Sequence, residues 1–145
     1  MSDTALYSVL LVGDNAAMRE ALARSLARRG CRVTTATTDA AALETLRERA
    51  FDAVITDLNM SERGGLWLWR QTVVLRPELR GRFVMIASEP LPEPRSLALF
   101  LETEQLVVKP LSLDTLWRQV QDILQRAPKR TSGARAQPSD LPARL

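Results

Sequence analysis

Short apolar runs alternate with amphipathic stretches along most of the chain. The apolar runs predict five β-strands, over residues 9–12, 32–36, 51–57, 82–88 and 106–108. The amphipathic stretches predict five helices, which follow Asn15, follow Asp39, cover 66–76, lie around 95–102 and follow Ser112. Because strands and helices alternate, we expect βαβ units with right-handed crossovers around a central parallel sheet, which is an α/β fold.

Residues at the element boundaries support this division. Asn15, Asp39 and Ser112 are each expected to be the N-cap of a helix, because short polar side chains accept hydrogen bonds from the first turn. The Gly64-Gly65 pair predicts a sharp turn in the loop before the helix at 66–76.

Two tryptophans and the cysteine are expected to have structural roles. Trp67 and Trp69 are two residues apart on a helix and cannot share a face, so one is expected to pack inward and the other to be available to a partner. Cys31 begins the second strand and is expected to be a small buried apolar residue.

The strand at 51–57 is apolar along almost its whole length and ends at a carboxylate, Asp57. A strand of this kind is buried on both faces, as strands of a parallel sheet are. In open α/β sheets, ligands bind at the carboxyl ends of the strands. Asp57 is therefore predicted to lie at the functional edge of the sheet.

Other strands bring further residues to the same edge. Asp14 follows the first strand, Ala87 and Ser88 end the fourth, and Lys109 follows the fifth. Asp14 and Asp57 are hard oxygen ligands suited to Mg²⁺, which keeps several waters beside one or two carboxylates. With the ion bound, Asp57 can act as a nucleophile toward phosphorus and form an acyl phosphate. Lys109 would balance the charge of the transferred group.

Composition excludes several kinds of chemistry. With 145 residues, of which 46% are apolar and 26% charged, the chain is typical of one soluble globular domain. It contains no His and one Cys, which excludes an internal disulfide, a Cys/His metal site and Ser-His or Cys-His catalysis. A conventional metabolic enzyme is not expected, and the glycine pattern of a dinucleotide-binding loop is missing.

Charge divides the sequence near residue 126. Residues 1–125 carry 15 Lys/Arg and 16 Asp/Glu, whereas residues 126–145 carry 5 Lys/Arg and 1 Asp. We therefore expect a lead-in at 1–6, a folded domain at 7–125 that binds no nucleic acid, and a disordered basic tail or linker at 126–145. Neither a signal peptide nor an apolar run of membrane-spanning length is found, so a cytoplasmic protein without membrane contact is expected.

Over residues 7–125 the chain resembles the receiver domain of two-component response regulators. The resemblance rests on the residues at 9–14, at 51–59 with Gly65, and at 107–110, and on the spacing between them. It implies a flavodoxin-like (βα)5 fold, with a five-stranded parallel sheet in the order 2-1-3-4-5 and helices on both faces. Three further segments look like receivers attached to hybrid sensor kinases, at 77–82, 100–102 and 109–111. Both a stand-alone receiver and a segment of such a kinase remain open.

The resemblance also implies roles for individual residues. Asp57 matches the aspartate that accepts a phosphoryl group from the histidine of a kinase or a phosphotransfer protein. Asp14 matches a Mg²⁺-binding acid, and Asn59 matches the position whose backbone carbonyl binds the ion. Lys109 matches the lysine that pairs with the phosphoryl group, and Pro110 follows it, often through a cis peptide bond in the family.

The sequence departs from the family pattern at four positions. The family usually has a second acid at the end of the first strand, Thr or Ser at the end of the fourth, often an aromatic residue in the fifth, and Pro two residues after the asparagine. This chain has Gly13, Ala87, Leu106 and Ser61 at these positions. Ser88 adjoins Ala87 but is expected to point to the opposite face of the sheet. Weak Mg²⁺ binding and an altered conformational switch are therefore expected.

Three functional hypotheses follow. In the first, the chain is a phosphoaccepting receiver that catalyses at most its own phosphorylation and dephosphorylation. Its output would run through the face formed by the fourth helix, fifth strand and fifth helix, a face that often forms homodimers in the family. In the second, it is a receiver-like interaction module that works without phosphorylation. In the third, the basic tail drives an association with nucleic acid that weakens with salt.

Overall fold

The computed structural model describes residues 7–60 and 62–126. The predicted lead-in at 1–6, Ser61 and the predicted tail beyond Arg126 lie outside the described residues. The strands are β1 (Tyr7–Val12), β2 (Cys31–Ala36), β3 (Ala53–Asp57), β4 (Phe83–Ala87) and β5 (Gln105–Val108). The helices are α1 (Ala16–Arg28), α2 (Asp39–Glu48), α3 (Gly65–Leu75), α4 (Pro94–Thr103) and α5 (Leu113–Gln125), with a 3-10 turn, η1 (Pro77–Leu79). No helix in the described part is long and apolar enough to cross a membrane.

All four neighbouring strand pairs are parallel, and the strand order is β2-β1-β3-β4-β5. This confirms the predicted flavodoxin-like sheet. The central strand β3 pairs with β1 on one side and β4 on the other, and Asp57 lies opposite Ile86. Because every strand runs in the same direction, the carboxyl ends of all five meet at one edge.

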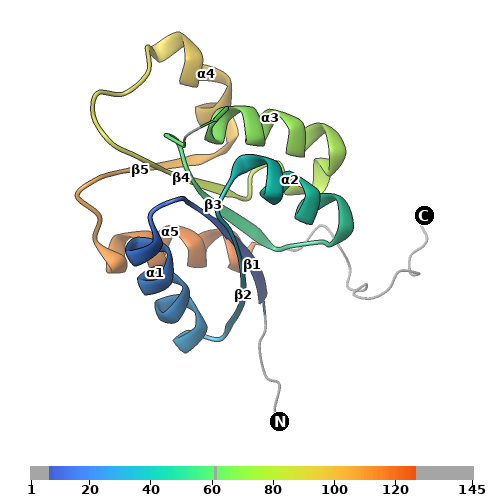
Figure 1. Cartoon of the computed structure of the whole chain (residues 1–145), viewed down its shortest axis with the longest axis vertical. Coiled ribbons are helices and arrows are strands. Elements are labelled where there is room, and N and C mark those ends of the chain that lie inside the picture. Colours follow the sequence, from blue (N-terminus) through green and yellow to red (C-terminus); the bar gives the residue numbers. More distant parts are fainter. Residues whose placement is uncertain (1–6, 61, 127–145) are drawn as a thin grey trace.

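The helices form a layer on each face of the sheet, with α1 and α5 on one face and α2, α3 and α4 on the other (Figure 1). Alternate residues of each strand point to opposite faces, so Leu10 and Val54 pack toward α2–α4 while Leu11 and Ile55 pack toward α1 and α5. Burial of each large apolar side chain contributes about 1.5–3 kcal/mol, which makes the sheet a firm platform for the residues at its edge.

The predicted burial of one tryptophan and of the cysteine is confirmed. Trp69 is 4% exposed, and its ring meets that of Phe100 edge to face, with 5.2 Å between centroids. Trp67 is half-buried beneath the guanidinium of Arg63, which lies 4.7 Å from the ring centroid. Cys31 is buried as the first residue of β2. Of the two tryptophans on this helix, Trp67 is the one that retains more surface toward solvent.

Two of the three predicted helix caps are confirmed and one is wrong. Asn15 and Ser112 accept hydrogen bonds from the backbone N–H groups of Met18 and Thr115, at 2.9 and 3.3 Å. The second helix is capped by Thr38, whose hydroxyl oxygen accepts from Ala41 N at 3.0 Å. Asp39 is instead the first residue of α2, and its carboxylate points to another part of the chain.

Candidate functional site

Asp57 is the last residue of β3 and is 8% exposed. It borders a small cavity of about 10 Å³ at the carboxyl edge of the sheet, roughly the space for one water molecule. Gly13, Met18, Arg19 and Ile86 line the same cavity. The cavity therefore places residues from β1, α1 and β4 around the carboxylate that ends the central strand.

Gly13 and Asp57 approach each other closely. A Cβ atom on residue 13 would lie 2.8 Å from Asp57 Oδ2, so the carboxylate occupies the space into which a side chain at this position would project. The Gly13 backbone is held from both sides. Its N–H donates to Ala36 O at 3.1 Å, and its carbonyl accepts from Arg19 Nη1 at 2.8 Å. The Asp57 carboxylate can therefore lie where it does because residue 13 has no side chain.

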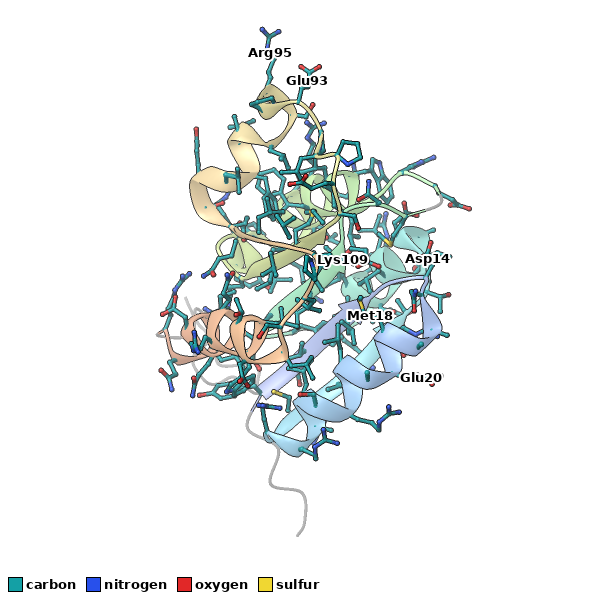
Figure 2. The ribbon with its side chains drawn as sticks, turned by 90° about the vertical axis from the view of Figure 1, so that its left-hand side faces the viewer. Asp14, Met18, Glu20, Glu93, Arg95 and Lys109 are labelled. Carbon is teal, nitrogen blue, oxygen red and sulfur yellow. The ribbon has the colours of Figure 1, made fainter. Side chains whose placement is uncertain are left out.

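Burial raises the pKa of the Asp57 carboxyl above its ordinary value; the Lys109 ammonium lowers this pKa, and the Asp14 carboxylate raises it. The structure therefore brings three of the residues singled out from the sequence within electrostatic reach of one another. Asp14 and Lys109 follow β1 and β5 at the same edge of the sheet, whereas Glu93 and Arg95 lie apart from them at the start of α4 (Figure 2). A cation in this place would stabilise the ionised form of Asp57.

The loop after Asp57 is fixed at both ends by the backbone. Leu58 N donates to Ile86 O at 2.8 Å, and Gly65 N donates to Leu58 O at 3.0 Å. Gly64 has a φ of 91°, which favours glycine, and a Cβ on Gly65 would lie 2.5 Å from Asp57 O. The predicted turn at this glycine pair is confirmed. Asn59 lies between the fixed ends and is exposed.

The residues at the family's switch positions belong to β4, to the segment after it and to β5. Ala87 is 1% exposed, ends β4, and its carbonyl accepts from Lys109 N at 2.8 Å. Ser88 follows the strand and is half-buried. Leu106 pairs with Met85 across the sheet and packs against the core on the α2–α4 face. The Lys109–Pro110 peptide bond is cis.

The oxygen donors at this edge are of the kind that Mg²⁺ prefers. Asp14 is exposed, Asp57 is buried, and the loop that carries Asn59 begins directly after Asp57. Among the described residues there is no group of three or more His, Cys, Asp or Glu side chains that could hold a metal. Mg²⁺ is commonly bound through one or two carboxylates and keeps several waters, so two carboxylates and one carbonyl suit it.

Sequence reasoning did not single out Arg19 or Met18, which line the cavity from the first turn of α1. Their closeness to Asn15, the helix cap after β1, is a usable signal, because the first turn of a helix that follows a strand lies over the strand's carboxyl end. Sequence reasoning also missed the long-range contacts of Asp39, for which the local pattern holds no signal.

The strand order and the carboxylate that ends the central strand define a flavodoxin-like α/β domain. The family model described as the response regulator receiver domain matches residues 9–121. The chain therefore belongs to the receiver domain family of response regulators.

Known proteins agree with this assignment. The "Response regulator receiver protein CpdR" of Brucella abortus (strain 2308) is 34% identical over 76 residues, which cover 52% of this chain and 63% of that protein. The chain thus matches less than two thirds of that relative's length. A CheY-like receiver domain protein from Methanospirillum hungatei superposes with a TM-score of 0.74 at 21% identity, covering 82% of this chain and 94% of that one.

The same fold occurs in the response regulator protein TrrA of Thermotoga maritima, whose structure is a complex with Mg²⁺ and BeF. It superposes with a TM-score of 0.71 at 24% identity, covering 82% of this chain and all of that one (100%). At this level of identity, the likeness establishes the shared fold.

Proposed function

We propose that this receiver accepts a phosphoryl group on Asp57 from the phosphohistidine of a histidine kinase or a phosphotransfer protein. Mg²⁺ would be held by the carboxylates of Asp14 and Asp57 and by the backbone carbonyl of Asn59. The observation that carries the proposal is the position of Asp57: a buried carboxylate at the end of the central strand, in the electrostatic field of Lys109 and Asp14. The proposed domain occupies residues 7–125, between a lead-in at 1–6 and a tail at 126–145, and works in the cytoplasm.

The proposed reaction is a phosphoryl transfer between two nucleophiles. A carboxylate oxygen of Asp57 attacks phosphorus, the new O–P bond forms, and the N–P bond to histidine breaks, leaving the imidazole with the electron pair. A bound Mg²⁺ supplies charge neutralisation for the phosphoryl oxygens. The Lys109 ammonium offsets the negative charge that remains on the transferred group.

The conformational response to this reaction is proposed to be weak or altered. A phosphoryl group shifts a two-state equilibrium only through contacts that differ between the states. Ala87 has no hydroxyl to offer such a contact, and Leu106 occupies the position where an aromatic residue often stands in the family. We propose output by protein contact, which includes a homodimer through the α4–β5–α5 face.

The test is labelling with acetyl phosphate, followed by intact mass spectrometry with Mg²⁺ or with EDTA. The wild-type chain is expected to gain one phosphoryl group only with Mg²⁺, and Asp57→Asn is expected to gain none. Lys109→Ala should slow labelling and Lys109→Arg should restore part of the rate, because the side chain acts through its charge. Labelling that persists in Asp57→Asn would overturn the proposal.

Gly13 and Ala87 favour a second candidate, an interaction module that works without phosphorylation. A single carboxylate beside Asp57 weakens the cation site, and the missing hydroxyl removes one contact for readout. A partner that binds wild type, Asp57→Asn and the phosphorylated chain equally well would establish this second function. A preference for the phosphorylated chain would exclude it.

A further inference from the structure

Asp39 is a buried carboxylate that is not used by its own helix. It is 1% exposed at the first position of α2, where the cap is already provided by the hydroxyl of Thr38. One oxygen, Asp39 Oδ2, accepts two hydrogen bonds from the backbone, from Arg63 N at 2.7 Å and Gly64 N at 2.8 Å. Both donors lie in the loop between β3 and α3, so the carboxylate joins two elements that are distant in sequence.

The loop that Asp39 holds begins at the phosphoacceptor. Its first residue after Asp57 is anchored to β4 through Leu58 N and Ile86 O, at 2.8 Å. Its last residue, Gly64, is anchored to Asp39 and has no space for a side chain, since a Cβ would lie 2.9 Å from Leu58 O. Asn59 lies between these anchors.

From this geometry we infer that Asp39 is a positioning residue for the cation site at Asp57. The inference rests on the proposed function, because it assigns Asp39 the task of fixing the loop whose Asn59 carbonyl would bind Mg²⁺. Proline restricts the backbone, and this sequence has Ser61 where the family usually has Pro. The Asp39 side chain restrains the C-terminal end of this loop from outside it.

The charge of Asp39 suits this task. A carboxylate forms stronger hydrogen bonds to backbone N–H groups than a neutral acceptor does, and the first turn of a helix favours a negative charge. Groups that hydrogen-bond directly to a metal ligand commonly change metal affinity about 10- to 100-fold, and Asp39 acts one step further out, on the loop that carries Asn59. Loss of the Asp39 carboxylate is therefore expected to weaken Mg²⁺ binding without removing any metal ligand.

The experiment measures Mg²⁺ affinity of the full chain by titration calorimetry, together with amide hydrogen exchange in metal-free protein. Asp39→Ala is expected to raise the Mg²⁺ Kd several-fold, up to about 10-fold, and to speed exchange at the amides of Arg63 and Gly64. Asp39→Asn keeps an acceptor oxygen but loses the charge, so its Mg²⁺ Kd is expected to lie between those of wild type and Asp39→Ala.

Glu104 provides a matched control for the loss of a buried carboxylate. It is 6% exposed and accepts from the backbone N–H groups of Gly81 and Phe83, at 2.6 and 2.9 Å. Phe83 begins β4, so these bonds lie at the opposite edge of the sheet from Asp57. Glu104→Ala is expected to destabilise the fold while leaving the Mg²⁺ Kd unchanged.

If Asp39→Ala does not fold, a second pair of variants tests the same interaction by changing a donor in the loop instead of the acceptor. Arg63→Pro removes one of the two donors, whereas Arg63→Ala keeps the N–H and loses only the side chain. We expect weaker Mg²⁺ binding in Arg63→Pro than in Arg63→Ala. Equal affinity in this pair, or wild-type affinity in a folded Asp39→Ala, would overturn the positioning role alone. If the wild-type chain binds no Mg²⁺, the proposed function itself fails, and the positioning role fails with it.

Discussion

Gly13 shows how one missing side chain can shape a site. Its backbone lies so close to Asp57 that the carboxylate fills the volume a side chain would enter, and its carbonyl is tied to Arg19. The site consequently holds two acidic side chains, Asp14 and Asp57, instead of the three that the family usually provides. A cation at this site would therefore meet less negative charge. With only Asp14 and Asp57 as carboxylate ligands, it would need more water molecules to complete its coordination.

Restoring the acid at position 13 tests this interpretation. Gly13→Asp is expected to lower the Mg²⁺ Kd about tenfold, because a third carboxylate joins the site. It is also expected to cost about 1–3 kcal/mol of unfolding free energy without metal, because its Cβ forces the Asp57 carboxylate to move. Gly13→Ala is the control: it should lose stability without gaining Mg²⁺ affinity. A tighter-binding Gly13→Ala would contradict the account.

The raised pKa of Asp57 predicts how the stability of the folded state depends on pH. Between its ordinary value of 3.8 and the raised pKa, the folded state binds more protons than the unfolded state, so stability falls as pH rises through this window. Asp57→Asn removes this loss. Without metal, the stability gained in Asp57→Asn should grow as pH rises through the window and then level off above it. Denaturant unfolding at a series of pH values measures the difference.

Asp14→Asn offers a check on the cause of that shift. Because the Asp14 carboxylate raises the pKa of Asp57, its neutralisation should lower this pKa and narrow the pH window from its upper end. Carbon-detected NMR titration of the Asp57 carboxyl would follow this change directly. A pKa that rises in Asp14→Asn would show that the two groups do not repel each other in solution.

At the scale of elements, the loops after β3 and β4 differ in how they are held. The loop after β3 is fixed by Leu58, Gly65 and the carboxylate of Asp39. The segment after β4 contains Pro90, Pro92 and Pro94, whose rings restrict the backbone up to the start of α4. The end of β4 itself carries no hydroxyl, because Ala87 is its last residue.

Adding a hydroxyl at the end of β4 should strengthen the response of the segment after β4 to phosphorylation. Ala87→Ser places one oxygen at the end of β4 at a buried position, with little added volume. On phosphorylation, amide exchange across residues 88–93 is expected to change more in Ala87→Ser than in wild type. Asp57→Asn in the same background should abolish the change. An equal response in wild type and Ala87→Ser would contradict the proposed role of Ala87.

The elements also show where local sequence is sufficient. Asn15 and Ser112 could be predicted as caps because their partners lie three residues away. Asp39 has the same local signature, but its partners lie 24 and 25 residues away, in a loop whose path depends on the whole sheet. The local spacing of residues predicts helix caps and strand ends. A contact that forms only through tertiary packing has no local sequence pattern from which it could be predicted.

At the scale of the whole molecule, the fold could be predicted because the alternation of apolar and amphipathic segments along the chain favours one sheet topology. Buried apolar strands alternating with helices favour a parallel sheet, and strand direction then gathers the strand-end residues Asp14, Asp57 and Lys109 at one edge. The close contact of Gly13 with Asp57 could not be predicted in the same way. It depends on the exact separation of β1 and β3, which is fixed by packing on both faces of the sheet.

The most direct test of the central claim is to locate the phosphoryl group. After reaction with acetyl phosphate and Mg²⁺, borohydride reduction converts a phosphorylated aspartate to homoserine, and tryptic mass spectrometry identifies its position. Cleavage after Arg49 and Arg63 releases one peptide that contains both Asp52 and Asp57, so a neighbouring carboxylate serves as an internal control. The account predicts conversion at Asp57 alone and only with Mg²⁺. Conversion at Asp52, or none at Asp57 in a chain that binds Mg²⁺, would contradict it.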